Sequence, residues 1–120
     1  MKRKNITAAV ALVVFLAIAI SLGAHHQKEA NRVACIETLR LIDSATARWE
    51  IERYGGSIAT IDKLVPTNVI PTWNDIALYG SRNWVGLDPY PPRCPSGGTY
   101  TLKRFPAIPT CSIPGHVLEP

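Results

Sequence analysis

A run of nineteen uncharged residues, from Ile6 to Ala24, follows directly behind the basic segment Lys2-Arg3-Lys4. A helix rises about 1.5 Å per residue, so this run reaches ~28 Å, close to the ~30 Å hydrocarbon core of a bilayer. We therefore expect a cytoplasmic basic stub and a transmembrane segment in residues 1–24, and an exported domain in residues 25–120. A domain of that length has room for one small core.

The distribution of charge predicts the orientation of this span and argues against nucleic acid as a partner. Three of the thirteen Lys and Arg residues precede the span and all nine acidic residues follow it, which leaves ten basic against nine acidic groups beyond the span. That balance provides no basic patch for DNA or RNA. Basic residues beside a span stay on the cytoplasmic side. We expect a single-pass inner-membrane protein with a cytoplasmic N-terminus and a periplasmic C-terminal domain.

A cleaved signal peptide is the alternative to a retained anchor. The apolar region of a signal peptide has about 7–15 residues and ends near a pair of small residues, which Ser21 and Gly23, or Ala19 and Ser21, would provide. The run is longer than a signal peptide needs, and this favours the anchor. Cleavage would instead release an exported soluble periplasmic binding protein. Both routes export residues 25–120.

The pattern remains helical beyond the span and predicts one long helix from about Ile6 to Tyr54. Gly55 then stands where helices end on a left-handed residue. Apolar residues at spacings of three and four form one stripe, which consists of Cys35, Leu39, Ile42, Ala45 and Trp49. The opposite, solvated face consists of Glu37, Arg40, Ser44, Arg48 and Glu52.

Two short helices are expected next. Thr60 would cap a helical turn that ends before Pro66, and Thr72 with Asp75 has the spacing of a capping box. The second helix would continue through Tyr79 until Gly80 stops it.

The sequence of the C-terminal third predicts an irregular loop followed by a β-hairpin. Residues 81–98 are rich in Pro and Gly, whereas residues 99–102 and 110–113 have strand character. A lone hairpin is marginally stable, so we expect it to lie against the apolar stripe. The predicted fold class is α+β, with a long N-terminal helix, its first half membrane-embedded, packed against a small head of short helices and a C-terminal β-hairpin.

Residues 30–118 resemble a group of bacterial type IV pilin-like proteins, the pseudopilins related to type II secretion. The resemblance is carried by the segment from Ala34 to Ala45, by Pro71-Thr72-Trp73, by Cys94-Pro95-Ser96-Gly97-Gly98-Thr99-Tyr100-Thr101 and by Pro109-Thr110-Cys111-Ser112-Ile113-Pro114-Gly115-His116. It implies a non-enzymatic, membrane-anchored structural or accessory component of a pilus or type II secretion apparatus. Its partners would be the inner membrane and other proteins of the assembly, with no cofactor, no nucleic acid and no small-molecule substrate. Loops 55–71 and 81–95 would contact partner subunits or exported cargo.

The N-terminus departs from the pilin pattern. Pilin precursors have a Gly at the peptidase site and a Glu in the apolar segment, whereas Asn5 and Val10 stand at the comparable positions here. A lipid-buried carboxylate is costly unless it is paired, and in pilins it is thought to pair with the freed N-terminus of a neighbouring subunit. We therefore expect an unprocessed N-terminus, and either a minor, non-polymerising component or a divergent relative of the pilins.

Three cysteines in an exported domain meet oxidising conditions. Cys94 and Cys111 both lie off the long helix and close a local loop, so we expect a disulfide between them, worth about 3 kcal/mol in the loop-entropy model. Three cysteines allow three pairings, so other connectivities stay open. Cys35 is then either a small apolar residue of the stripe or a thiol that forms an intermolecular bridge.

Metal and catalytic sites are disfavoured by spacing. The cysteines and His116 contain no C-x-x-C pair, which zinc sites usually have, and a Cys–His nucleophile pair lacks an accompanying oxyanion signature. Calcium needs several oxygen ligands, and Asp88 is the single acidic residue between 81 and 118. We therefore assign no catalytic, cofactor-binding or metal residue from the sequence, and His116 is expected to form structural hydrogen bonds in the terminal turn.

Overall fold

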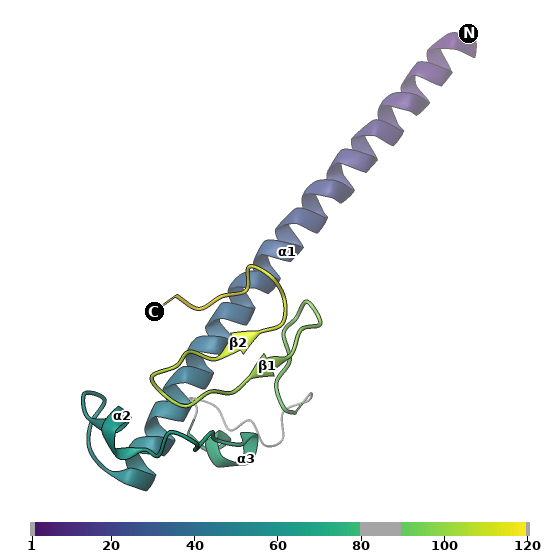
Figure 1. The fold of residues 1–120 in the computed structure, drawn as a ribbon. Helices are drawn as coiled ribbons and strands as arrows, with labels where there is room; N and C mark the ends of the chain where they lie inside the picture. Colours follow the sequence, from purple (N-terminus) through teal and green to yellow (C-terminus); the bar gives the residue numbers. More distant parts are fainter. Residues whose placement is uncertain (1, 80–89, 120) are drawn as a thin grey trace. The chain divides into compact units, whose positions relative to one another are not determined.

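The computed structural model describes residues 2–79 and 90–119 and has the expected α+β fold. The elements are α1 (Lys2–Tyr54), α2 (Ile61–Leu64), α3 (Trp73–Ile76), β1 (Tyr100–Thr101) and β2 (Thr110–Cys111). Figure 1 shows their order along the chain. The chain divides into two compact units, residues 1–30 and residues 31–120. Trp84, Asp88 and most of the expected loop 81–95 lie outside the described residues.

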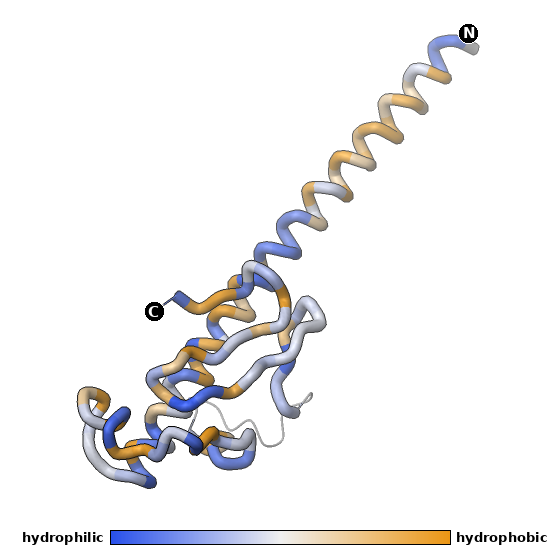
Figure 2. The backbone as a smooth tube through the Cα atoms, in the orientation of Figure 1, coloured by the Kyte–Doolittle hydropathy of each residue, from blue (hydrophilic) through white to orange (hydrophobic). Residues whose placement is uncertain are grey.

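The first unit is the apolar part of α1. The helix begins at Lys2, four residues before the expected start, and Thr7 donates a hydrogen bond to the carbonyl oxygen of Arg3. Its most apolar window has a mean hydropathy of 2.6, and none of that window is buried. Figure 2 shows the apolar run between polar ends. Among the described residues this is the one helix long and apolar enough to cross a membrane, as predicted.

The second unit is built on the remainder of α1, and its core confirms the predicted stripe. All five stripe residues, Cys35, Leu39, Ile42, Ala45 and Trp49, are buried. On the opposite face Glu37 and Arg40 form an ion pair, and both side chains are more than half exposed. The covered face is wider than the stripe, because Thr46, Ala47 and Glu50 are buried as well.

The segment after α1 differs in one detail from the prediction. Gly55 adopts a φ of +79° and donates its N–H to Ile51, as expected for a helix C-terminus. Thr60 precedes α2 but its side chain does not cap that helix. Its hydroxyl oxygen instead accepts the backbone N–H of Ser57, which closes the preceding turn. Competition from a local turn is a common alternative for a Thr hydroxyl.

The capping box of α3 is confirmed. The N–H of Asp75 donates to Thr72 Oγ1 at 3.2 Å, and the N–H of Thr72 donates to Asp75 Oδ2 at 2.7 Å. The helix itself ends at Ile76, so the expected continuation to Tyr79 is wrong. Residues 77–79 form a turn in which Tyr79 donates its N–H to Ile76.

The hairpin is present and shorter than predicted. β1 and β2 pair antiparallel, with Tyr100 opposite Cys111 and Thr101 opposite Thr110. A further backbone bond from Ser112 to Thr99 extends the pairing. Tyr100 is buried against the α1 stripe together with Leu118. The hairpin therefore obtains from α1 the support that an isolated two-stranded ribbon lacks.

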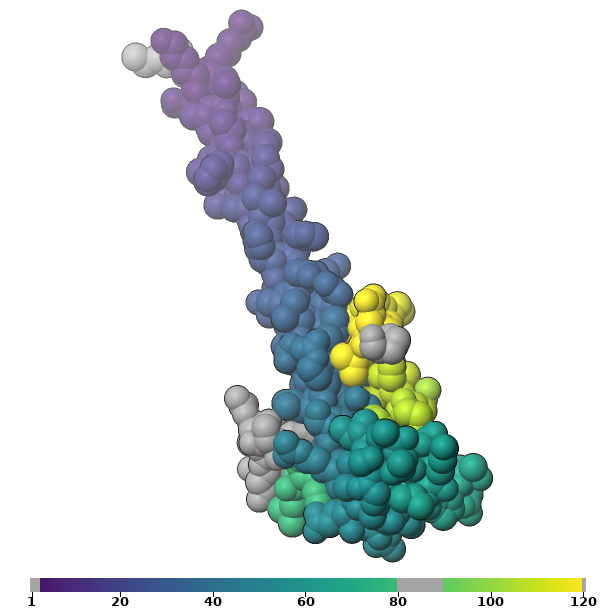
Figure 3. All heavy atoms as spheres, turned by 90° about the vertical axis from the view of Figure 1, so that its left-hand side faces the viewer, coloured from purple at the N-terminus to yellow at the C-terminus, as the bar shows by residue number. Residues whose placement is uncertain are grey.

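The C-terminal segment also lies on α1. Val117 and Leu118 share a surface groove with Arg32, Ile36 and Arg40, and Figure 3 shows this segment directly beside the helix. The chain after β2 thus returns to the same stretch of α1 that carries Cys35.

Candidate functional site

The described residues bring four potential metal ligands together, and they come from four separate segments. Cys35 lies on α1, Cys94 precedes β1, Cys111 is in β2 and His116 is in the C-terminal segment. Their ligand atoms all lie within 4.8 Å of one another. Cys94 Sγ and His116 Nδ1 are 3.2 Å apart. Cys35, Cys94 and His116 are buried, and Cys111 is half-buried.

A tight turn places Cys94. Gly97 donates its N–H to the Cys94 carbonyl at 2.9 Å, and Cys94 donates to the carbonyl of Gly98 at 3.1 Å. Gly97 has a φ of +88°, in the region that favours glycine. Backbone N–H groups of Ser96 and Gly98 also point at the Cys94 sulfur.

Gly98 makes room for Cys111. A Cβ at Gly98 would lie 2.6 Å from Cγ1 of Ile113 and 3.0 Å from Sγ of Cys111. The glycine therefore lets the turn approach β2 closely. Ile113 in its turn points its N–H at the Cys111 sulfur, at 3.5 Å.

His116 is positioned by the last turn of the chain. Its N–H donates to the Ile113 carbonyl at 3.2 Å, and the preceding Gly115 adopts a φ of +82°. The expected structural hydrogen bond of His116 is thus present in its backbone. Its imidazole is used differently, because Nδ1 faces the Cys94 sulfur.

The thiols are electrostatically unequal. Burial raises the pKa of Cys35 to about 12, and the neighbouring thiols of Cys94 and Cys111 add to this effect. Burial also opposes ionisation of Cys94, but hydrogen bonds from Ser96, Cys35, Cys111 and Gly98 outweigh it and lower the pKa of Cys94. Burial raises the pKa of Tyr100, whose hydroxyl faces Cys35 and Thr38 but has no hydrogen-bond partner of standard geometry among the described residues.

The three cysteines are free thiols in this structure. The predicted Cys94–Cys111 disulfide therefore stays a prediction, with both sulfurs already in one cluster. Cys35 occupies the predicted stripe position and is fully buried, so it packs as expected. It also joins the cluster, a role that its place on the helix did not indicate.

A second buried polar group lies farther along α1. Glu50 is fully buried, and its Oε1 accepts the N–H of Phe105 at 3.0 Å. Burial raises the pKa of Glu50, while that hydrogen bond and the nearby Arg104 partly offset the increase. Arg104 also donates to the backbone carbonyl of Val65 at 2.7 Å. These contacts tie α1 to the loop between the strands and to the end of α2.

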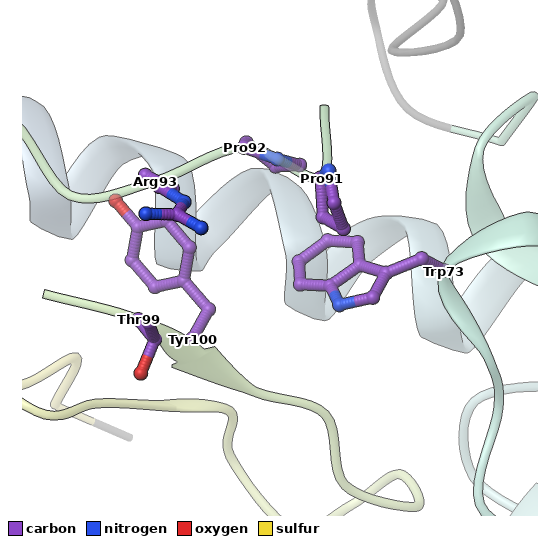
Figure 4. A pocket seen from close by; sticks show the side chains of 6 residues that line it. All are labelled: Trp73, Pro91, Pro92, Arg93, Thr99 and Tyr100. Atoms are coloured by element: carbon purple, nitrogen blue, oxygen red, sulfur yellow. The ribbon is translucent and has the colours of Figure 1, made fainter. Parts of the chain in front are cut away.

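A small pocket lies beside β1. One pocket of about 150 Å³ is lined by Trp73, Pro91, Pro92, Arg93, Thr99 and Tyr100. Figure 4 shows Arg93 beside the Tyr100 ring and Trp73 beside Pro91. Sites for small molecules usually enclose about 300–1,000 Å³, so this pocket is smaller than such a site.

Comparisons with protein-family models, curated proteins and solved structures give no match for this chain.

Sequence reasoning missed the convergence of Cys35 and His116 with the other two cysteines. The spacings contain no local ligand pair, and contacts between four distant segments are not visible in a linear pattern. The available signal was the placement of Cys94 and Cys111 in short Pro- and Gly-containing turns, with His116 in a third turn. The burial of Glu50 was not indicated by the sequence, except that Glu50 directly follows the stripe residue Trp49.

Proposed function

We propose that this protein is a membrane-anchored, pilin-like component that acts through assembly and not through catalysis. The observation that carries the proposal is that α1 contains both the apolar run and the buried stripe of the head. In a protein of this kind, the same helix holds the chain in lipid and provides the core of the exported head. The resemblance of residues 30–118 to pseudopilins supports the same interpretation.

The charge pattern supports an N-in orientation. Three basic residues precede the span, and basic residues remain preferentially in the cytoplasm. The head, residues 25–120, is then periplasmic in a bacterium with two membranes. Its partners are other subunits of a pilus or type II secretion apparatus.

Loop 55–71 offers a surface for those partners. Three large apolar side chains in it, Ile58, Leu64 and Ile70, are about half exposed or more. Exposed apolar residues that gather in one segment favour a protein contact over a solvated loop.

Crosslinking in living cells tests the proposal. A photo-crosslinking residue at position 58 or 64, followed by extraction of membranes and mass spectrometry, should capture a second copy of the chain or proteins that themselves begin with a pilin-like helix. The same residue at position 37, on the solvated face of α1 and outside the groove that Arg48 shares with Ile58, is the matched control. Capture of soluble enzymes alone, or equal yields at all three positions, would contradict the proposal.

The state of the N-terminus provides a separate check. The chain should keep the residues before Ile6, because Asn5 stands at the position of the Gly after which prepilin peptidase cuts in the pilins that it resembles. Sequencing that finds Ile6 at the N-terminus would show processing and overturn the minor-component interpretation.

A further inference from the structure

The cluster of three thiols and one imidazole has the donor set of a structural zinc site. Zinc in such sites is tetrahedral, with Cys3His among the usual sets, Zn–S bonds of ~2.3 Å and Zn–N bonds of ~2.0 Å. Those bonds place ligand atoms about 3.5–3.8 Å apart. The four ligand atoms lie within 4.8 Å of one another, and the Cys94–His116 pair is at 3.2 Å.

We propose that Cys35, Cys94, Cys111 and His116 together bind one Zn²⁺ ion that stabilises the head. This assignment goes beyond the proposed function and does not depend on it, since a soluble head would hold the same ion. It also reverses the conclusion from sequence spacing, which found no local ligand pair.

The burial of these side chains favours their binding to a shared metal ion over their remaining as separate polar groups without partners. Cys35, Cys94 and His116 are more than nine-tenths buried, and both cysteines belong to a core cluster of hydrophobic residues that includes Tyr100, whose hydroxyl faces Cys35. Buried polar groups are costly unless they have partners. A single cation satisfies all four ligands at once.

The turns around the sulfurs are suited to thiolates. Cys94 has the N–H groups of Ser96 and Gly98 directed at its sulfur, and Cys111 has that of Ile113. Hydrogen bonds to the ligating atoms orient the ligands of a metal site and tune the metal. Gly98 keeps the space beside Cys111 Sγ clear.

A zinc site uses residues that a disulfide leaves without a role. A Cys94–Cys111 bridge would employ two of the four groups and leave Cys35 and His116 buried beside it. The same sulfurs cannot be in a disulfide and bind zinc as thiolates, so the two predictions exclude each other experimentally.

The site is accessible from one side. A groove of about 530 Å³ is lined by Cys111 and His116 together with residues of the hairpin loop and the C-terminal segment. A hydrated ion can approach through this groove, because Cys111 is only half-buried.

Binding conserves charge and involves no electron transfer. Each of the three thiols releases one proton to solvent and forms one Zn–S bond, and the neutral imidazole donates the lone pair of Nδ1. The imidazole proton then resides on Nε2. The resulting site carries a net charge of −1.

The test is the zinc content of the full chain, purified in detergent from membranes without chelators. We expect one zinc per chain by elemental mass spectrometry, and free thiols at Cys94 and Cys111 by alkylation mapping. His116→Ala and Cys94→Ser should weaken zinc binding by about 100-fold or more in competition with a chromophoric chelator. His116→Cys, which keeps a ligand at that position, should retain the metal.

The control is His25→Ala, which removes an exposed histidine of the first compact unit, residues 1–30, and should leave zinc content unchanged. Should the ligand variants fail to fold, replacement of zinc by Co²⁺ in the unsubstituted chain gives an independent answer. It should show thiolate-to-cobalt charge transfer and the visible bands of tetrahedral cobalt. Absence of stoichiometric zinc, a mapped Cys94–Cys111 disulfide, or zinc that persists in both His116→Ala and Cys94→Ser would overturn the assignment.

Discussion

The absence of a side chain at Gly98 allows the turn that carries Cys94 to pack closely against β2. The turn that carries Cys94 reaches β2 only because position 98 has no Cβ, which would collide with Ile113 and press on Cys111. The packing of this turn on β2 is therefore limited by how closely the two backbone segments approach each other, and not by the size of the core side chains.

We predict that Gly98→Ala destabilises the head by about 1–3 kcal/mol, the usual cost of overpacking. Ser96→Ala is the matched control, because its side chain is exposed and the substitution keeps the backbone N–H. It should change the free energy of unfolding by less than about 0.5 kcal/mol. Denaturant unfolding followed by tryptophan fluorescence measures both, and equal effects would contradict the packing argument.

Glu50 makes stability depend on pH. Its folded-state pKa lies above the ordinary value of 4.5, because the carboxyl is buried. The folded chain therefore binds the proton more tightly than the unfolded chain. This contribution to stability is complete below pH 4.5 and is lost as pH rises through the raised pKa.

We predict that Glu50→Gln removes this contribution, while the amide oxygen of the new side chain still accepts the N–H of Phe105. The free energy of unfolding of the unsubstituted chain minus that of the variant should be larger near pH 4.5, the ordinary pKa of the carboxyl, than at neutral pH. Denaturant titrations of both proteins at the two pH values measure this difference. A difference that is constant, or that grows toward neutral pH, would show that Glu50 does not retain its proton in the folded state.

At the scale of the elements, α3 depends on its cap. A helix of four residues has little stability of its own, and the reciprocal bonds of Thr72 and Asp75 satisfy two of its free N–H groups. We predict that Thr72→Ala lowers the free energy of unfolding by about 1 kcal/mol. Thr67→Ala, at an exposed loop position, should be neutral. Identical thermal midpoints for the two variants would contradict a role for the cap.

The apolar half of α1 is tested by a charge at its centre. Phe15→Lys places an ammonium group in the middle of the span, at a cost of about 3 kcal/mol in membrane insertion. We expect a reduced share of the chain in the membrane fraction. Ile58→Lys adds the same charge to an exposed position in the head and should leave that share unchanged. Equal fractionation of both variants would show that residues 6–24 do not anchor the protein.

Periodicity and capping motifs predicted the elements well, because they act over a few residues. The stripe from Cys35 to Trp49 and the Thr72 box both follow from local spacing. Thr60 was misassigned because its hydroxyl has a competing partner in Ser57. The ligand cluster was missed for a different reason, since Cys35 and His116 meet only after the hairpin and the C-terminal segment have packed on α1.

The molecule as a whole combines an apolar helical run with a small packed head. Residues 6–24 form a helical run long and apolar enough to cross a membrane, and residues 31–120 form a head whose core includes the stripe, the hairpin and the proposed zinc ligands. The polar contacts of Glu50 and Arg104 secure the far end of that head. Loop 55–71, with Ile58, Leu64 and Ile70 about half exposed or more, is the surface that we propose for partners.

The most direct measurement is the fate of the native chain in washed membranes. Membranes are stripped with alkaline carbonate, and the protein is extracted and weighed by intact mass spectrometry. The chain should stay in the pellet, and its mass should include residues 6–24. Loss of Met1 alone is compatible with this result. A chain recovered from the soluble fraction, shortened by cleavage near Ala24, would contradict it.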